Sequence, residues 1–335
     1  MSRTSTRPLT LSILDLATVG EEQTAAEGLQ ATVALAQRAE AAGYKRVWYA
    51  EHHNVTSIAS SAPAVLIAHV AARTTRIRLG AAGVMLPNHS PLVVAEQFGT
   101  LAAFNPGRID LGLGRAAGGD PATWSALRRD PRSGESFPQD VRELQAYLCG
   151  ESLVTGVEAV PRADEIVPLY ILGSSLFGAR VAAALGLPYA FASHFAPGAL
   201  EAAVSLYRHE FQPSGQLEAP YVLASVNIFA ADDEAEARLD FEEAMRTRVA
   251  FLLTGRRVVS DEAYKHLAAS PQGQYVAGML AYSAVGAPRQ VKQYLSTFAR
   301  HAEADELVIV FASLQAERRL KSVDLVAQSM GAVGD

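Results

Sequence analysis

Short apolar and β-branched runs alternate along the chain with longer stretches of helical periodicity. The short runs predict eight strands, at residues 9–14, 46–50, 76–81, 108–113, 169–172, 189–192, 222–230 and 306–311. The longer stretches predict helices at residues 23–42, 62–73, 91–104, 121–129, 137–150, 176–185, 198–211, 232–253, 288–300 and 315–330. We expect Asp232 to be the N-cap of the helix over 232–253. Nearly every predicted strand is therefore followed by a helix.

This alternation predicts a (β/α)₈ TIM barrel, because strands joined by helical crossovers pair in parallel through right-handed connections. Such barrels run from about 200 to over 400 residues. An open doubly wound sheet is the alternative. The chain has no internal repeat or flexible linker, so we expect a single domain over residues 1–335. Insertions are expected after the fourth strand, at about 116–167 with possible short strands in 151–167, and after the seventh, at about 255–283.

Composition narrows the class of protein. With 49% apolar and 19% charged residues, the chain can bury a core that offsets chain entropy, which excludes disorder. Cys149 is the single cysteine, which excludes an internal disulfide and fits a reducing compartment. The net charge of −6, without a basic block, argues against nucleic acid or an anionic membrane as a partner. No apolar run suits a signal peptide or a membrane span, so we expect a cytoplasmic protein.

In a barrel of this type the active site forms at the carboxyl ends of the strands. Polar and small residues gather just after the predicted strands. They are Asp15, Leu16, Glu51, His52, His53, Ala82, Gly83, Val84, Met85, Gly114, Arg115, Gly173, Ser174, Ser175, Ser193 and His194. This concentration is the first indication of where function lies.

The turn after the fifth predicted strand has the features of an anion site. Gly173 permits a close backbone turn, the hydroxyls of Ser174 and Ser175 follow, and Gly178 stands in the first turn of the next helix. Free N–H groups at a helix N-terminus favour phosphate. The alternative is an ordinary serine N-cap. Arg115, after strand four, is the cation expected to face the same anion, the alternative being a surface ion pair.

The Glu-His-His run at residues 51–53 admits several interpretations. Neighbouring residues at a strand end point to opposite faces, so only one of these histidines faces the barrel axis. The run lacks the spacing of a metal site, which argues against a bound metal. A site histidine that carries a proton or donates a hydrogen bond is favoured over a packing histidine. The glycine-rich stretch 112–119 departs from the spacing of a dinucleotide-binding loop, and no nucleophile elbow is present.

Four segments, at residues 51–54, 78–101, 105–120 and 169–195, resemble the bacterial luciferase-like flavin monooxygenases, most closely their single-chain subgroup. The resemblance runs in order over almost the whole chain. It implies a (β/α)₈ barrel, usually a homodimer, that binds FMN. The reduced FMN commonly comes from a separate NAD(P)H-dependent flavin reductase. The chemistry that the resemblance implies is reaction of reduced flavin with O₂ to a C4a-peroxide, which oxidises a small organic substrate, aldehyde-like or other.

The resemblance also implies roles for individual residues. Ala82 and Gly83 correspond to a non-prolyl cis peptide against the flavin ring, where the glycine would ease close approach. Arg115, Ser174 and Ser175 match the family's phosphate-binding groups. His52 matches its catalytic histidine. Residues 84–86 would form an apolar wall beside the flavin, and 255–283 would be a mobile lid.

The chain departs from the pattern of this family at one position, and the resemblance leaves two alternative functions open. Gly114 replaces a reactive cysteine of the luciferases, which argues against light emission. One alternative is hydride transfer with the deazaflavin F420 as cofactor. Another is a non-catalytic FMN-binding protein, against which the retained His52 argues.

Overall fold

A computed structural model of the protein describes residues 9–115 and 120–331. The strands within these ranges are β1 (Thr10–Asp15), β2 (Arg46–Tyr49), β3 (Arg78–Met85), β4 (Ile109–Gly114), β5 (Leu169–Gly173), β6 (Tyr189–Phe191), β7 (Val222–Ala230), β8 (Ser283–Gly286) and β9 (Glu306–Phe311). All the pairings between them are parallel. Strands β1 to β7 pair in sequence, β7 pairs with β9, and β9 pairs with β1, which closes an eight-stranded (β/α)₈ barrel.

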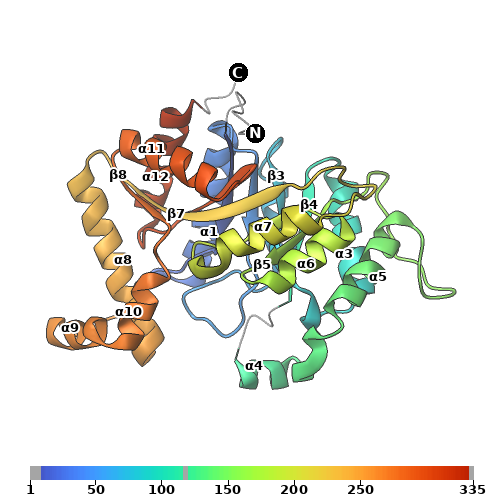
Figure 1. The fold of residues 1–335 in the computed structure, drawn as a ribbon, viewed down its shortest axis with the longest axis horizontal. Coiled ribbons are helices and arrows are strands. Elements are labelled where there is room, and N and C mark those ends of the chain that lie inside the picture. The colour runs from blue at the N-terminus through green and yellow to red at the C-terminus, as the bar shows by residue number, and fades with distance from the viewer. Residues whose placement is uncertain (1–8, 116–119, 332–335) are drawn as a thin grey trace.

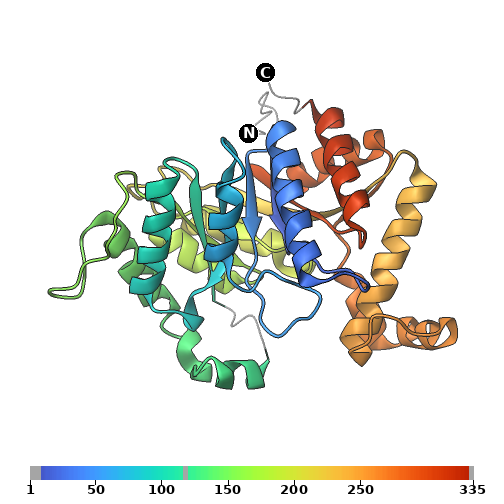
Figure 2. The same cartoon turned by 180° about the vertical axis from the view of Figure 1, so that it is seen from behind.

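Helices surround the barrel (Figures 1 and 2). They are α1 (Ala25–Ala41), α2 (Pro63–Ala71), α3 (Pro91–Phe104), α4 (Pro121–Ala126), α5 (Phe137–Cys149), α6 (Leu176–Leu185), α7 (Leu200–Glu210), α8 (Glu234–Thr254), α9 (Asp261–Ala269), α10 (Pro271–Gly278), α11 (Pro288–His301) and α12 (Ala316–Met330). Short 3-10 turns lie at Leu86–Asn88, Pro131–Gly134 and Pro197–Ala199. Both views show α4 and the α9–α10 pair on the side of the barrel where α1 begins, which is the side of the carboxyl ends of the strands.

Three local predictions were wrong. Asp233, not Asp232, is the N-cap of α8, because its carboxylate accepts the N–H of Glu236 at 2.9 Å. The stretch between α5 and β5 forms turns and bends rather than short strands. The irregular segment expected after residue 255 contains α9, α10 and β8, and β8 extends the sheet by pairing with residues 227–230 of β7.

Apolar side chains form two clusters on either side of the barrel wall. The larger one fills the space between strands and helices, whereas the smaller one lies inside the barrel and includes Leu14, Trp48, Tyr170 and Val308. Successive strand residues face opposite sides of the wall, so one strand supplies both clusters. Because the inner cluster is small, it does not fill the whole interior of the barrel.

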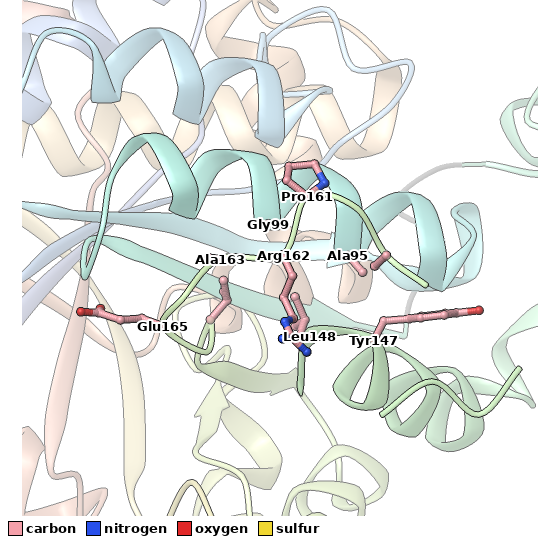
Figure 3. Close-up of a pocket in the computed structure, with 10 residues that line it drawn as sticks. Ala95, Gly99, Tyr147, Leu148, Pro161, Arg162, Ala163 and Glu165 are labelled. Atoms are coloured by element: carbon pink, nitrogen blue, oxygen red, sulfur yellow. The ribbon is translucent and has the colours of Figure 1, made fainter. Parts of the chain in front are cut away.

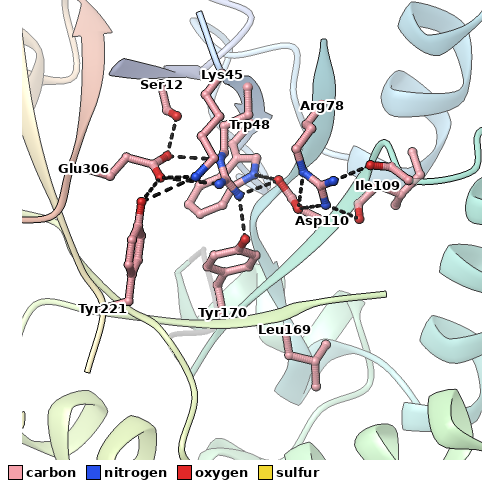
Figure 4. Close-up of polar contacts among 12 residues, drawn as sticks. Ser12, Lys45, Trp48, Arg78, Ile109, Asp110, Leu169, Tyr170, Tyr221 and Glu306 are labelled. Carbon is pink, nitrogen blue, oxygen red and sulfur yellow. Dashed lines mark hydrogen bonds and ion pairs between the residues drawn. The ribbon is translucent and has the colours of Figure 1, made fainter. Parts of the chain in front are cut away.

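A buried network of charged groups closes the amino-terminal end of the barrel (Figure 4). Arg46, at the start of β2, donates to Asp110 Oδ2 at 2.7 Å and to Glu306 Oε2 at 3.3 Å, and both carboxylates are inaccessible to solvent. Tyr170 accepts a further hydrogen bond from Arg46 at 2.6 Å, and Trp48 donates to Asp110 at 3.0 Å. Each buried charge therefore has an opposite partner.

No helix in the described ranges combines the length and the apolar character needed to cross a bilayer.

Candidate functional site

A cavity of about 610 Å³ opens at the carboxyl ends of the strands. Its volume falls within the range of roughly 300–1,000 Å³ that small-molecule sites occupy. The residues predicted to be catalytic or to bind the cofactor line it: His52, Ala82, Gly83, Arg115, Gly173, Ser174, Ser175 and Gly178. The structure thus brings these residues together, although they come from four different strands and their loops.

The turn between β5 and α6 presents unpaired donors to this cavity. Ser174 and Ser175 are exposed, and within the described residues neither hydroxyl makes a hydrogen bond, even though Ser175 is the N-cap of α6. Gly173 and Gly178 allow the turn to fold tightly, because a Cβ on Gly178 would lie 3.3 Å from the Cα of Gly173. Tyr189 fixes the turn by donating to the carbonyl of Ser175 at 3.0 Å. The geometry suits an anion held by hydroxyls and helix N–H groups.

Arg115 supplies a positive charge at the same turn. Its guanidinium carbon lies 4.0 Å from the ring centroid of Phe177, a residue in the first turn of α6. The cation–π contact holds an otherwise exposed side chain over the helix N-terminus. The expected pairing of this cation with the serine turn is therefore possible in the fold as it stands.

The peptide bond between Ala82 and Gly83 is cis, as the resemblance implied. It lies in a bulge of β3, where the pairing with β4 passes from Ala81 to Val84 while β4 advances by two residues. The fold itself also requires a glycine at this position. A Cβ on Gly83 would lie 2.7 Å from the carbonyl oxygen of Gly112 and 2.5 Å from Leu172 Cδ1, so glycine is needed for packing against β4.

The expected apolar wall is only partly present. Met85 lines the cavity, but Val84 and Leu86 point away from it into the outer core, where they are 3% and 0% exposed. This is the alternation of a strand, which places only every second side chain on the inner face. Met85 Sδ would also lie 2.9 Å from a Cβ on Gly114, so it fills space next to that glycine.

The carboxylate of Glu51 binds two histidines, His53 in the loop after β2 and His89 in the loop after β3. This buried carboxylate accepts hydrogen bonds from His53 Nε2 at 2.9 Å, His89 Nε2 at 2.9 Å and the N–H of Met85 at 3.0 Å. Burial alone would raise the pKa of Glu51, but these hydrogen bonds outweigh it and lower the pKa. His53 thus turns toward Glu51, whereas His52 lines the cavity. Burial lowers the pKa of His52 and favours its neutral form.

His194 is a second histidine in the cavity wall and is 7% exposed. Its Nδ1 lies 2.7 Å from the hydroxyl oxygen of Ser225, which donates its own proton to the carbonyl of Phe191 at 2.8 Å. Ser225 must therefore accept from His194, which places the ring proton on Nδ1 and leaves a lone pair on Nε2. Burial, with Arg248 and His52 nearby, lowers the pKa of His194 to about 3.

Sequence reasoning missed the contribution of β7 and α8 to the site. Ser225, Asn227, Thr247, Arg248 and Phe251 all line the cavity. The helical pattern of α8 shows no signal that singles out these positions, because which face of the helix covers the mouth depends on how the helix docks. Among the described residues, no group of three or more His, Cys, Asp or Glu side chains is placed to hold a metal ion.

A second depression lies on the outer surface, where residues 159–165 pack over α3 and α5 (Figure 3). Ala95, Gly99 and Leu148 line it together with Pro161 and Arg162. It has no room for a ligand, because its own side chains fill it.

Comparison with known proteins identifies the family. The model of the luciferase-like monooxygenases matches residues 9–305. The chain belongs to this family. A luciferase-like monooxygenase of Escherichia coli (strain K12) is 45% identical over 324 residues, covering 95% of this chain and 96% of the relative. The N-acetyl-S-alkylcysteine monooxygenase of Bacillus subtilis (strain 168) is 41% identical over 258 residues, covering 74% of this chain and 75% of the relative.

Solved structures share the fold of this chain. The crystal structure of apo-MsnO8 has a TM-score of 0.86 and 34% identity, and the match covers 98% of this chain and 100% of that one. Two more distant structures, each 16% identical, share the fold alone. One is the oxygenating constituent of the Pseudomonas putida 3,6-diketocamphane monooxygenase in complex with FMN (TM-score 0.72, covering 96% of this chain and 97% of that one). The other is an F420-dependent secondary alcohol dehydrogenase with an F420-acetone adduct (TM-score 0.69, covering 98% and 100%).

Proposed function

We propose that this protein is a flavin-dependent monooxygenase that uses reduced FMN and O₂ to oxidise a small organic substrate. The observation that carries the proposal is the convergence, in one cavity, of a hydroxyl-lined helix N-terminus, an arginine stacked over it and a largely apolar lining that includes Ala82. The first two suit a phosphate, and the apolar lining suits a planar ring. The chain belongs to a family of luciferase-like monooxygenases, which supports the oxygen chemistry.

The residues present fit FMN. Ser174, Ser175 and Arg115 would hold its phosphate, because both hydroxyls and the guanidinium have donors without a partner among the described residues. Ala82 and Gly83 would support the ring. When bound in reduced form, FMN supplies the electron pair that activates O₂.

The remaining cavity residues orient the substrate and exclude water. His52, neutral because its pKa is lowered, would donate a hydrogen bond or pass a proton from its imidazole N–H. Met85, Phe229 and Phe251 contribute apolar walls that keep water from the reacting groups. The Bacillus subtilis relative is named an N-acetyl-S-alkylcysteine monooxygenase, which makes S-alkylated N-acetylcysteines the first substrates to try.

We infer the wider setting from the same resemblance. A separate NAD(P)H-dependent reductase would supply the reduced flavin, and the protein would act as a cytoplasmic homodimer built from a single domain over residues 1–335. Exposed apolar side chains on α2 and α3, among them Val65 and Phe104 at 71% and 82% exposure, support association of two copies.

The test begins with FMN reduced under anaerobic conditions, mixed with the protein and then with O₂. We expect the absorbance of oxidised flavin to return more slowly than it does in buffer, and isotopically heavy O₂ to label the product of N-acetyl-S-methylcysteine or another small substrate. The proposal is refuted if the protein leaves flavin reoxidation unchanged and binds F420 in preference to FMN. Slow reoxidation with no labelled product from any substrate would instead indicate the flavin-storage alternative.

A further inference from the structure

Arg248 is a cation without a counter-charge in the cavity wall. It projects from α8 between Thr247 and Phe251, which line the same cavity. Within the described residues its guanidinium makes no hydrogen bond and no ion pair, and its Nη1 is both inaccessible to solvent and without a partner. Burial lowers its pKa, and no carboxylate acts to raise it. Charged groups are rarely buried in proteins without a partner, so a missing partner needs an explanation.

The other charges around the cavity do not supply that partner. Arg115 stacks on Phe177, and Arg257 donates from Nη2 to the carbonyl of Val19 at 2.6 Å. Among the described lining residues, Asp15 alone carries a carboxyl group. Burial raises the pKa of Asp15, and the cation that acts on it is Arg319 rather than Arg248. The cavity wall therefore carries an excess of positive charge.

The surroundings of Arg248 limit what can neutralise it. His194 is close enough for the charge of Arg248 to lower its pKa, and it remains neutral with a lone pair on Nε2. Phe229, Phe251 and Leu280 complete an apolar wall. A ligand group placed beside Arg248 thus meets a guanidinium set in a largely apolar wall. An organic anion with an apolar body suits this combination.

This anion is distinct from the flavin phosphate. Arg115 and the serine turn lie at the ends of β4 and β5, whereas Arg248 lies on the helix that follows β7. Among the described lining arginines, one therefore stands at the phosphate turn, one is bonded to a backbone carbonyl and one remains.

We propose that Arg248 binds a carboxylate of the substrate, so that the enzyme acts on small organic acids with an apolar portion. This rests on the proposed function, because it takes the cavity to hold flavin and substrate together. The planar guanidinium can donate two parallel hydrogen bonds to a carboxylate, which fixes the orientation of the bound molecule as well as its affinity. The apolar end of the substrate then points away from α8 toward the centre of the barrel.

The test compares matched ligands that differ only in charge. The pairs are N-acetyl-S-benzylcysteine with its primary amide, and phenylbutyrate with phenylbutyramide. Binding is measured by calorimetry and by the fluorescence of Trp48, which lines the cavity, with and without oxidised FMN. We expect at least one carboxylate to bind about tenfold or more tightly than its amide. In Arg248→Gln this preference should disappear, whereas Arg248→Lys should keep part of it.

Arg238→Gln is the matched control. Arg238 lies on the same helix, pairs with Glu234 and does not line the cavity, so this variant should keep the full carboxylate preference. Equal binding of acid and amide by the unaltered protein in both pairs would overturn the proposal. So would a loss of FMN affinity relative to riboflavin in Arg248→Gln, because it would assign the arginine to the flavin phosphate. Binding needs no oxygen chemistry, so a carboxylate preference would stand even if the monooxygenase activity were absent.

Discussion

His194 should make the stability of this protein depend on pH. The imidazole is 7% exposed, donates from Nδ1 to Ser225, and has its pKa lowered by burial from 6.5 to about 3. In the unfolded chain the same group has an ordinary pKa. The perturbation is His194→Asn, whose amide can still donate to Ser225 but does not titrate.

The sign of this pH dependence follows from whether the folded or the unfolded protein takes up the proton first on acidification. On acidification the unfolded chain binds a proton at His194 below about pH 6.5, while the folded protein resists until about pH 3. The stabilising contribution is therefore complete above pH 6.5 and is lost as the pH falls through this window. Between pH 7 and pH 5 the loss amounts to about 2 kcal/mol of unfolding free energy.

Urea unfolding at pH 5, 6 and 7 gives the measurement, followed by Trp fluorescence. Other groups titrate in the same range, so the quantity to compare is the difference between the unaltered protein and His194→Asn. This difference should shrink by about 2 kcal/mol as the pH falls from 7 to 5. Parallel stability curves for the two proteins would refute the reasoning, and so would a direct NMR titration that placed the pKa of His194 near 6.5.

Three further predictions concern the flavin site and the barrel. Arg115→Ala should weaken FMN binding about tenfold, the low end for a charged hydrogen bond because the side chain is exposed, and should leave riboflavin binding unchanged in a flavin fluorescence titration. Arg46→Met should cost about 1–3 kcal/mol in urea unfolding, because Asp110 and Glu306 would lose their shared donor and, among the described residues, keep only Arg78 and Lys45 as cationic partners. Gly83→Ala should cost about 1–3 kcal/mol, since its Cβ would lie 2.7 Å from the oxygen of Gly112; a thermal midpoint equal to that of the unaltered protein would contradict this.

The order of strands and helices could be predicted because it depends on local periodicity. The eight strands of the barrel all lie at apolar runs that the sequence shows plainly, whereas closure is established by the pairings of β6 with β7 and of β9 with β1. The strand β8 was missed because its sequence, Ser-Ala-Val-Gly, is not an apolar run, and only its pairing with β7 makes it a strand. The Asp232 error has a similar origin, since two adjacent aspartates are equivalent candidates until the backbone selects one.

The candidate site was predictable only where it follows directly from a strand end. His52, Arg115 and Ser174 fall there, and topology alone brings them to one rim. Other residues at this end of the barrel come from farther away. His89, which binds Glu51, belongs to the loop after another strand, and Arg248 stands near the end of a long helix. Their positions depend on packing angles that no sequence pattern encodes.

Each end of the barrel contains an arginine, and the two differ in whether a carboxylate of the protein neutralises them. At the floor, Arg46 is 2% exposed and meets two buried carboxylates, so its charge is neutralised within the protein. At the mouth, Arg248 has no such partner among the described residues. Arg46 is removed from water almost entirely, and Arg248 is half-buried with its Nη1 inaccessible to solvent, so at both positions a charge without a partner would be unfavourable. Stability alone would favour a neutral residue at the mouth. An arginine there is therefore best explained by a negative charge that arrives with a ligand, whereas the floor needs none.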